Sequence, residues 1–238
     1  MKKKIISANP EMLAQNPVVD SLTQQATIQP ELSEILLKEY KTYVLENGKQ
    51  PATVHQFTKL LGIPEGDFYE HFNSFNAIEK LIWKNYFDQT VERIESEEIY
   101  NQYSVREKLL AFYFTLVEVL KSNRSFVTYT LKGFNRTELN PEVLKSFKQQ
   151  FNYFANDLLN EGKETDEIVN RPLISIRYDE GLWLQFLFVL RFWLNDDSAQ
   201  FEKTDAAIEK AVHLSFDLMG KGPLDSMVDF AKFIYQNK

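Results

Sequence analysis

Residues 52–72 read ATVHQFTKLLGIPEGDFYEHF, and this stretch decides the fold. Thr53 is a good N-cap for a short helix, and Gly62 can adopt the left-handed conformation that a tight turn needs. Pro64 suits the first turn of a second short helix, which we expect to end near Phe72. Two short helices joined by a glycine turn make a helix-turn-helix, although any hairpin of two helices could contain such a turn.

The remainder of the chain predicts further helices and no strands. Apolar residues recur at spacings of three and four along each segment, as they do on the inward face of a helix. Helix start and stop signals place the segments at about 31–46, 75–96, 104–121, 126–132, 141–162, 173–194, 204–219 and 223–235. The sequence therefore predicts an all-α fold, with an N-terminal three-helix helix-turn-helix domain and a larger C-terminal helical bundle.

The composition excludes several kinds of site. The 238 residues include no cysteine, which rules out disulfides, cysteine-bound metals and thiol nucleophiles. None of the three histidines pairs with another at the i, i+4 metal-binding spacing, and there is no phosphate-binding loop or nucleophile elbow. We therefore predict no metal, no cofactor and no enzymatic activity.

No segment resembles a targeting signal or a membrane span. The most apolar stretch runs from Leu182 to Leu194 and is interrupted by Gln185 and Arg191. It is shorter than the roughly 20 apolar residues that cross a bilayer. These features predict a cytoplasmic protein.

The segment from Leu36 to Ile78 resembles the N-terminal signature of the tetracycline-repressor (TetR/AcrR) family of transcriptional regulators. Its specific part is Gly62-Ile63-Pro64-x-Gly66-x-Phe68-Tyr69-x-His71-Phe72, and further matches are Gly48, Thr53-Val54, Phe57 and Ala77-Ile78. The resemblance implies a flexible arm over residues 1–30, a helix-turn-helix DNA-binding domain over 31–79, and a ligand-binding and dimerisation domain over 80–238.

The same resemblance implies how the head would bind an operator in double-stranded DNA. Thr53 would contact the DNA backbone, and Tyr69 and His71 would bind phosphates. The residues facing base edges would be Pro64, Glu65, Gly66 and Asp67.

The charge of the head departs from the usual pattern of such proteins. Residues 31–80 hold five basic and eight acidic side chains, so 5 − 8 gives −3, and the whole chain carries −7. Phosphate contacts supply most nonspecific affinity for DNA, so this head should bind DNA weakly on its own. Lys2, Lys3 and Lys4 could enter a minor groove as a basic arm, or they could form a solvated tail.

Aromatic residues concentrate in the later helices and leave two interpretations open. They are either an ordinary core or the lining of a tunnel for a small hydrophobic ligand, the usual ligand in the TetR family. The candidate lining residues are Phe112, Phe126, Tyr129, Phe147, Phe151, Phe154, Trp183 and Phe186. The resemblance further implies a homodimer, with the helices from Leu182 to Trp193 and from Ala206 to Met219 at the interface.

The leading hypothesis is a ligand-responsive transcriptional regulator, most often a repressor in this family. The alternative is a binding protein of the same fold that holds a lipid or isoprenoid and has lost operator binding. The acidic second helix of the helix-turn-helix motivates this alternative.

Overall fold

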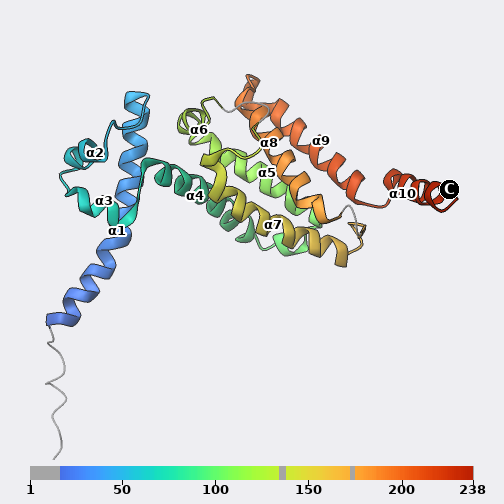
Figure 1. Cartoon of the computed structure of the whole chain (residues 1–238), viewed down its shortest axis with the longest axis horizontal. Helices are drawn as coiled ribbons and strands as arrows, with labels where there is room; N and C mark the ends of the chain where they lie inside the picture. Colours follow the sequence, from blue (N-terminus) through green and yellow to red (C-terminus); the bar gives the residue numbers. More distant parts are fainter. Residues whose placement is uncertain (1–16, 134–137, 172–174, 238) are drawn as a thin grey trace, which may run out of the picture. The chain divides into compact units, whose positions relative to one another are not determined.

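The computed structural model describes residues 17–133, 138–171 and 175–237, and within these ranges it contains helices and no strand (Figure 1). The all-α prediction is thus confirmed. The chain forms two compact units, a head of residues 1–73 and a body of residues 74–238. The division falls before the predicted boundary at residue 79, because the first turn of the fourth helix belongs to a continuous helix of the body.

The head consists of α1 (Pro17–Asn47), α2 (Val54–Leu61) and α3 (Glu65–His71). Its core is a column of rings, one from each helix. Phe57 of α2 meets Tyr40 of α1 edge to face with ring centroids 6.2 Å apart, and meets Phe68 of α3 in the same way at 6.4 Å. Leu36 and Val44 complete the inward face of α1.

The first helix begins earlier than predicted. The sequence places its start near Glu31, after Pro30, but α1 begins at Pro17. Both prolines fit the rule that proline stands at the first helical position, and the structure uses the earlier one. The rest of the predicted arm, residues 1–16 with its three lysines, lies outside the described residues.

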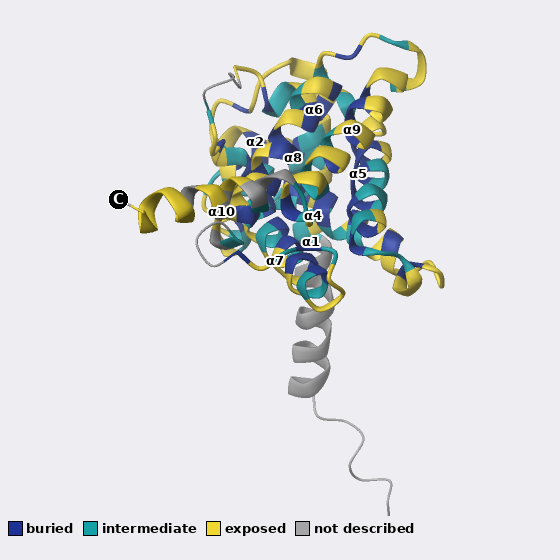
Figure 2. Ribbon diagram, turned by 90° about the vertical axis from the view of Figure 1, so that its right-hand side faces the viewer, coloured by how far each residue is buried: buried dark blue, intermediate teal, exposed yellow. Residues whose placement is uncertain are grey.

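The body contains the longer helices. They are α4 (Phe75–Glu95), α5 (Val105–Lys121), α6 (Arg124–Thr130), α7 (Lys145–Glu164), α8 (Tyr178–Leu194), α9 (Glu202–Met219) and α10 (Pro223–Gln236). Helix α5 packs against α4, α7 and α9, and α8 packs against α7 and α9. Buried residues line the facing sides of these helices, whereas the described part of α10 is mostly exposed (Figure 2).

Side-chain caps set the starts of α4 and α5. Ser74 accepts a hydrogen bond from the backbone of Ala77 at the start of α4, and Ser104 and Glu107 form a capping box at the start of α5. The predicted helix over 173–194 is wrong at its start. In the described part a short 3-10 turn, Ser175–Arg177, precedes α8, because the backbone at Arg177 leaves the helical conformation.

Candidate functional site

The turn between α2 and α3 is fixed by local hydrogen bonds. Thr53 begins α2 and its hydroxyl accepts a hydrogen bond from the backbone N–H of Gln56 at 3.1 Å. Gly62 ends α2 at φ 70° and ψ 24°, a left-handed conformation that glycine adopts at little cost. The next residue, Ile63, donates its N–H to the carbonyl of Thr58 at 3.1 Å. The helix-turn-helix predicted from the sequence therefore has the backbone it requires.

Helix α3 is anchored from one side only. Phe68 is its single buried residue, and Phe68 packs on the rings of Phe57 and Phe72. Tyr69 and Glu70 point into solvent, and the side chain of Tyr69 is half exposed. All the predicted DNA contacts of this region are exposed or half-buried: Pro64, Glu65, Gly66, Asp67, Tyr69 and His71. The structure thus brings them together on one short, accessible element, with Thr53 exposed at the start of α2.

Gly66 has no structural need to be glycine. Its φ is not in the left-handed region, and a Cβ added to it would meet no atom within 4 Å. Gly62 differs, because its φ of 70° strains any other residue. The missing side chain at Gly66 therefore leaves an open approach to the first turn of α3.

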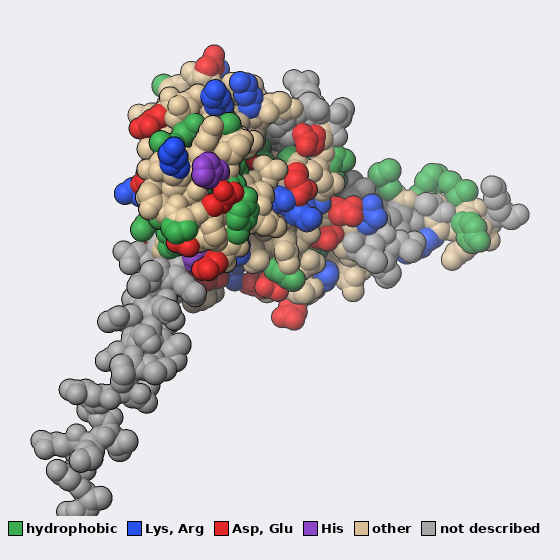
Figure 3. All heavy atoms as spheres, turned by 60° about the vertical axis from the view of Figure 1, so that its left-hand side comes forward, with side chains coloured by type: hydrophobic (Ala, Val, Ile, Leu, Met, Phe, Trp, Pro, Cys, Tyr) green, Lys and Arg blue, Asp and Glu red, His purple; other side chains and the backbone are tan. Residues whose placement is uncertain are grey.

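Charges near this turn are mixed. Glu65 accepts a hydrogen bond from the hydroxyl of Tyr69 at 3.4 Å and lies 3.3 Å from Nδ1 of His55. Glu65 and Asp67 stand in the first turn of α3, where the helix dipole stabilises carboxylates. The same carboxylates repel DNA phosphates. On the face shown in Figure 3, acidic and basic side chains are interspersed and form no single basic patch.

The aromatic residues of the body form a packed cluster. Phe186 of α8 stacks on Phe147 at 4.7 Å and on Trp183 at 4.9 Å, and Phe151 lies 5.5 Å from Phe186. Phe112 of α5 extends the cluster by stacking on Phe154 at 4.8 Å. The other two candidate ligand residues, Phe126 and Tyr129, lie on α6 with ring centroids 6.4 Å apart. Rings at these distances fill the space between α5, α7 and α8.

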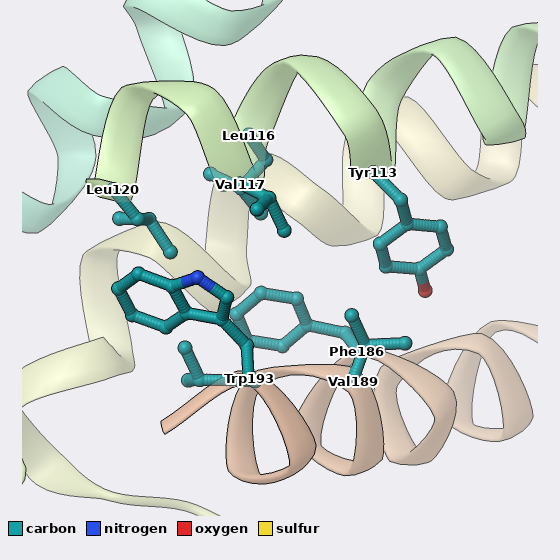
Figure 4. A pocket seen from close by; sticks show the side chains of 8 residues that line it. Tyr113, Leu116, Val117, Leu120, Phe186, Val189 and Trp193 are labelled. Carbon is teal, nitrogen blue, oxygen red and sulfur yellow. The ribbon is translucent and has the colours of Figure 1, made fainter. Parts of the chain in front are cut away.

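A small cavity lies beside this cluster, between α5 and α8 (Figure 4). Its volume is about 10 Å³, enough for roughly one water molecule. Of the predicted ligand residues, it is lined by Phe186 alone. The other lining residues are Tyr113, Leu116, Val117, Leu120, Val189, Leu190 and Trp193.

The opposite side of α8 is an open apolar groove shared with α9. Leu184, Phe188 and Phe192 follow one another at intervals of one turn along α8, and each is at least 36% exposed. Leu214 of α9 is 58% exposed on the other wall. The groove has a volume of about 720 Å³, and Lys203 lies among its lining residues. Both helices that the sequence assigned to dimerisation thus contribute to it.

A comparison with family models matches residues 108–234, more than half of the chain, to the tetracycline repressor-like C-terminal domain. The chain belongs to the TetR family. The match covers the body from α5 to α10, which shows that the family resemblance extends beyond the helix-turn-helix on which it was first recognised.

Solved structures agree in fold. A protein from Syntrophomonas wolfei str. Goettingen, described as a TetR-family transcriptional regulator, is 18% identical, with a TM-score of 0.58 over 79% of this chain and 95% of that one. A TetR-family protein from Shewanella sp. PV-4 is 12% identical, with a TM-score of 0.53 over 79% of this chain and 97% of that one. A protein of unknown function from Rhodococcus sp. RHA1 has the same TM-score at 13% identity, over 80% and 96% of the two chains. A comparison with curated proteins gives no match.

Two further properties of this TetR-family chain concern the described residues alone. No helix among them is both long and apolar enough to cross a membrane. In the same residues, His, Asp and Glu side chains form no group of three that could hold a metal ion.

Sequence reasoning missed two buried polar groups, which belong to residues that line the small cavity. Tyr113 and Trp193 are fully buried, and the hydroxyl of one and the indole N–H of the other find no hydrogen-bond partner among the described residues. Each stands in a run of apolar residues, so the sequence did not single either of them out. The available signal was that both helices place cavity residues at the same i, i+3, i+4, i+7 spacing.

Proposed function

We propose that this TetR-family chain is a ligand-responsive transcriptional regulator, most simply a repressor, that acts on DNA in the cytoplasm. The observation that carries the proposal is the orientation of α3. Phe68 fixes the helix to the head, while the exposed side of α3 presents Tyr69, Glu70 and the open position at Gly66. A helix of this length with an accessible first turn fits a major groove about 12 Å wide.

In this proposal one group of side chains contacts DNA phosphates and another contacts base edges. The exposed hydroxyl of Thr53 and the polar tips of Tyr69 and His71 can donate hydrogen bonds to phosphate oxygens. Glu65 and Asp67 can accept hydrogen bonds from the N4 amino group of cytosine, the base edge that acidic side chains read. The acidic side chains of α3 would then favour DNA sequences that place cytosines opposite its first turn.

Dimerisation would use the groove of α8 and α9. A row of large apolar side chains on α8 is exposed to solvent, namely Leu184, Phe188 and Phe192. Exposure of apolar surface to water is unfavourable in free energy, and burial against a second copy of the chain would remove that exposure. Two-fold pairing of these helices would place two heads on successive half-sites of an operator.

Ligand response would arise in the body. Helix α4 follows the head directly in the sequence and packs on α5 and α7, both of which carry aromatic residues of the cluster. A hydrophobic ligand that separates these helices would move α4 and thereby change the spacing of the heads. Ligand and DNA would then each weaken the binding of the other.

The test is selection of genomic fragments on immobilised protein, followed by an electrophoretic shift with the selected DNA. We expect the Tyr69→Ala variant to lose the shift. A matched control is Tyr153→Ala, which removes a tyrosine that is 62% exposed on α7 of the body. Equal binding by both variants and the original chain would contradict the docking of α3.

A second candidate, a lipid- or isoprenoid-binding protein that does not bind an operator, is favoured by one observation. Glu65 and Asp67 occupy the first turn of α3, where they repel phosphates. Native mass spectrometry of the purified chain separates the two functions. A co-purified lipid together with no retained genomic fragment would support the second candidate.

A further inference from the structure

Helix α10 carries large apolar side chains that are exposed in a single copy of the chain. Met227, Phe230 and Ile234 follow one another at spacings of three and four, so they lie on one side of the helix. Their exposed fractions lie between 48% and 65%, and Phe233 beside them is 61% exposed. Hydrophobic side chains are accordingly visible along the described part of α10 (Figure 3). Apolar surface of this extent on one short helix marks a contact with another molecule.

The first turn of α10 is fixed to the body by a buried arginine. The guanidinium of Arg171 donates a hydrogen bond to the carboxylate of Asp225 at 2.7 Å, and only 7% of the arginine side chain is exposed. The N–H of Gly222 donates to the same carboxylate at 3.0 Å. Arg171 also donates to three backbone carbonyls at the end of α9, those of Leu218, Met219 and Gly220. Folding α10 back onto its own α9 would break these bonds around a buried charge, which is costly.

The groove between α8 and α9 has the length and shape that α10 requires. The α8 wall carries large side chains, including Phe188 and Phe192, whereas the α9 wall includes four small ones, namely Ala206, Ala207, Ala211 and Ser215. Large side chains of another helix can pack between such walls. The α9 wall extends from Lys203 to Ser215, roughly 18 Å, and α10 with its 14 residues is about 21 Å long.

Charge also makes α10 a better occupant of the groove than a second bare groove. Among the residues that line the groove, the charged ones are Lys203 and Lys210. Two grooves placed face to face would bring four lysines into one apolar interface, where like charges repel and lose hydration. Helix α10 has one lysine and two aspartates, one of which is paired with Arg171, so it adds no excess of positive charge. The same composition argues against a membrane surface, because membrane-bound amphipathic helices are rich in Lys and Arg.

We propose that α10 is an exchanged arm, so that α10 of each copy lies in the α8–α9 groove of a second copy of this chain. Met227, Phe230 and Ile234 enter the groove and cover Phe188 and Phe192 of the other copy. Each copy gives one arm and receives one, so the arrangement is two-fold and closed. The inference rests on the proposed dimerisation at this groove and names the segment of the second copy that fills it.

The surface that the exchange buries is of the size that a stable dimer needs. An aromatic side chain buries about 150–250 Å², so the exposed parts of Phe230 and Phe233 amount to roughly 250 Å² per arm, to which Met227 and Ile234 add. Each copy would bury one arm and one groove of similar area. The total approaches the roughly 800 Å² per partner of a standard protein interface.

Cross-linking tests which surfaces meet. The chain has no cysteine, so an introduced cysteine is its one thiol. Full-length Phe230→Cys with an affinity tag is co-expressed with untagged full-length Phe188→Cys, and the purified mixture is treated with a short bifunctional maleimide. We expect a covalent product of one tagged and one untagged chain, and little product from either variant alone.

Sedimentation of charged variants supplies an independent measurement. Phe230→Glu should raise the dissociation constant of the dimer at least about tenfold, because it replaces buried apolar surface with a charge. Gln236→Glu is the matched control, since it adds the same charge to the same helix. Nine residues, or two and a half turns, separate Gln236 from Met227, so it stands on the opposite side of α10. Its dimer should be as stable as that of the original chain.

Four results would overturn the arm exchange. Cross-linking of Phe188→Cys alone would show that two grooves meet directly, and cross-linking of Phe230→Cys alone would show that two arms pair with each other. A bridge within one chain that carries both cysteines would place the arm in its own groove. Equal dimer affinity in Phe230→Glu and Gln236→Glu would show that the apolar side of α10 is not buried.

The arm exchange and the proposed function fail in different ways. A Phe188→Cys dimer that cross-links to itself removes the exchange and retains pairing at the groove. An original chain that sediments as a monomer removes both the exchange and the proposed dimer. Binding of DNA by the head is measured separately, by the electrophoretic shift of the original chain.

Discussion

Replacing Gly66 with alanine should separate the stability of the head from its binding to DNA. The added Cβ has no atom within 4 Å to clash with, and the backbone there is not left-handed. Alanine favours a helix over glycine by about 0.5–1 kcal/mol in a helix interior, and by less near an end. We therefore expect the free energy of unfolding of Gly66→Ala to be unchanged or raised by a few tenths of a kcal/mol, roughly.

Gly62→Ala is the matched control, four residues earlier in the same turn. Its φ of 70° places the new side chain in the left-handed region. That conformation costs a non-glycine residue roughly 1–2 kcal/mol, partly offset by the lower entropy of the unfolded alanine chain. We expect a net loss of about 1 kcal/mol, so of the two substitutions only Gly62→Ala should lower the stability.

Gly66→Ala should weaken DNA binding even though it leaves the stability of the head intact. In Gly66→Ala the methyl group occupies the approach to the first turn of α3, and we expect operator affinity to fall at least about tenfold, which corresponds to about 1.4 kcal/mol. Urea denaturation followed by circular dichroism gives the stability, and fluorescence anisotropy with labelled operator gives the affinity. Undiminished affinity in Gly66→Ala would show that DNA does not approach this turn, and a large loss of stability would contradict the open space around Gly66.

Three other experiments test the groove, the charge of α3 and the stability of the body. Phe188→Glu should convert the proposed dimer to a monomer in analytical ultracentrifugation, because it places a charge in the apolar groove, whereas Tyr153→Glu on the exposed surface of α7 should not. Combining Asp67→Asn with Glu70→Gln should raise DNA affinity, more at low than at high salt, and an effect independent of salt would contradict phosphate repulsion. Burial alone would raise the pKa of Asp196, but hydrogen bonds from the side chains and backbone of two neighbours outweigh burial and hold that pKa well below its usual value. Its carboxylate thus adds stability that is fully present above its unfolded pKa of about 4 and is lost as pH falls from there through the folded pKa. Asp196→Asn should therefore lower the melting temperature at neutral pH, and by a smaller amount at about pH 3, where part of the stabilisation is already lost.

Local chemistry made the head predictable from sequence. The limits of α2 and α3 follow from Thr53, Gly62 and Pro64, each of which acts on its own neighbours in the chain. The start of α1 was harder, because Pro17 and Pro30 satisfy the same rule and the sequence alone does not rank them.

The interior of the body could not be predicted in the same way. Helical spacing places Phe147, Phe151 and Phe154 on one side of α7, but it does not say which rings of other helices meet them. In the structure Phe147 stacks on Phe186 and Phe154 on Phe112, which fills space that the sequence left open as a possible tunnel. Such partners depend on how whole helices pack, and no local motif encodes that.

Helix α8 lines the small cavity with one side and the apolar groove with the other, and this limits which substitutions it can accept in evolution. Eight of its 17 residues line either the cavity or the groove, and the two sets alternate along the helix, so a substitution there that alters one surface is close to the other. Leu116, Val117 and Leu120 of α5 line the cavity and take no part in the groove. Over evolution, the shape of the cavity can therefore change through substitutions in α5 that leave the groove unaltered.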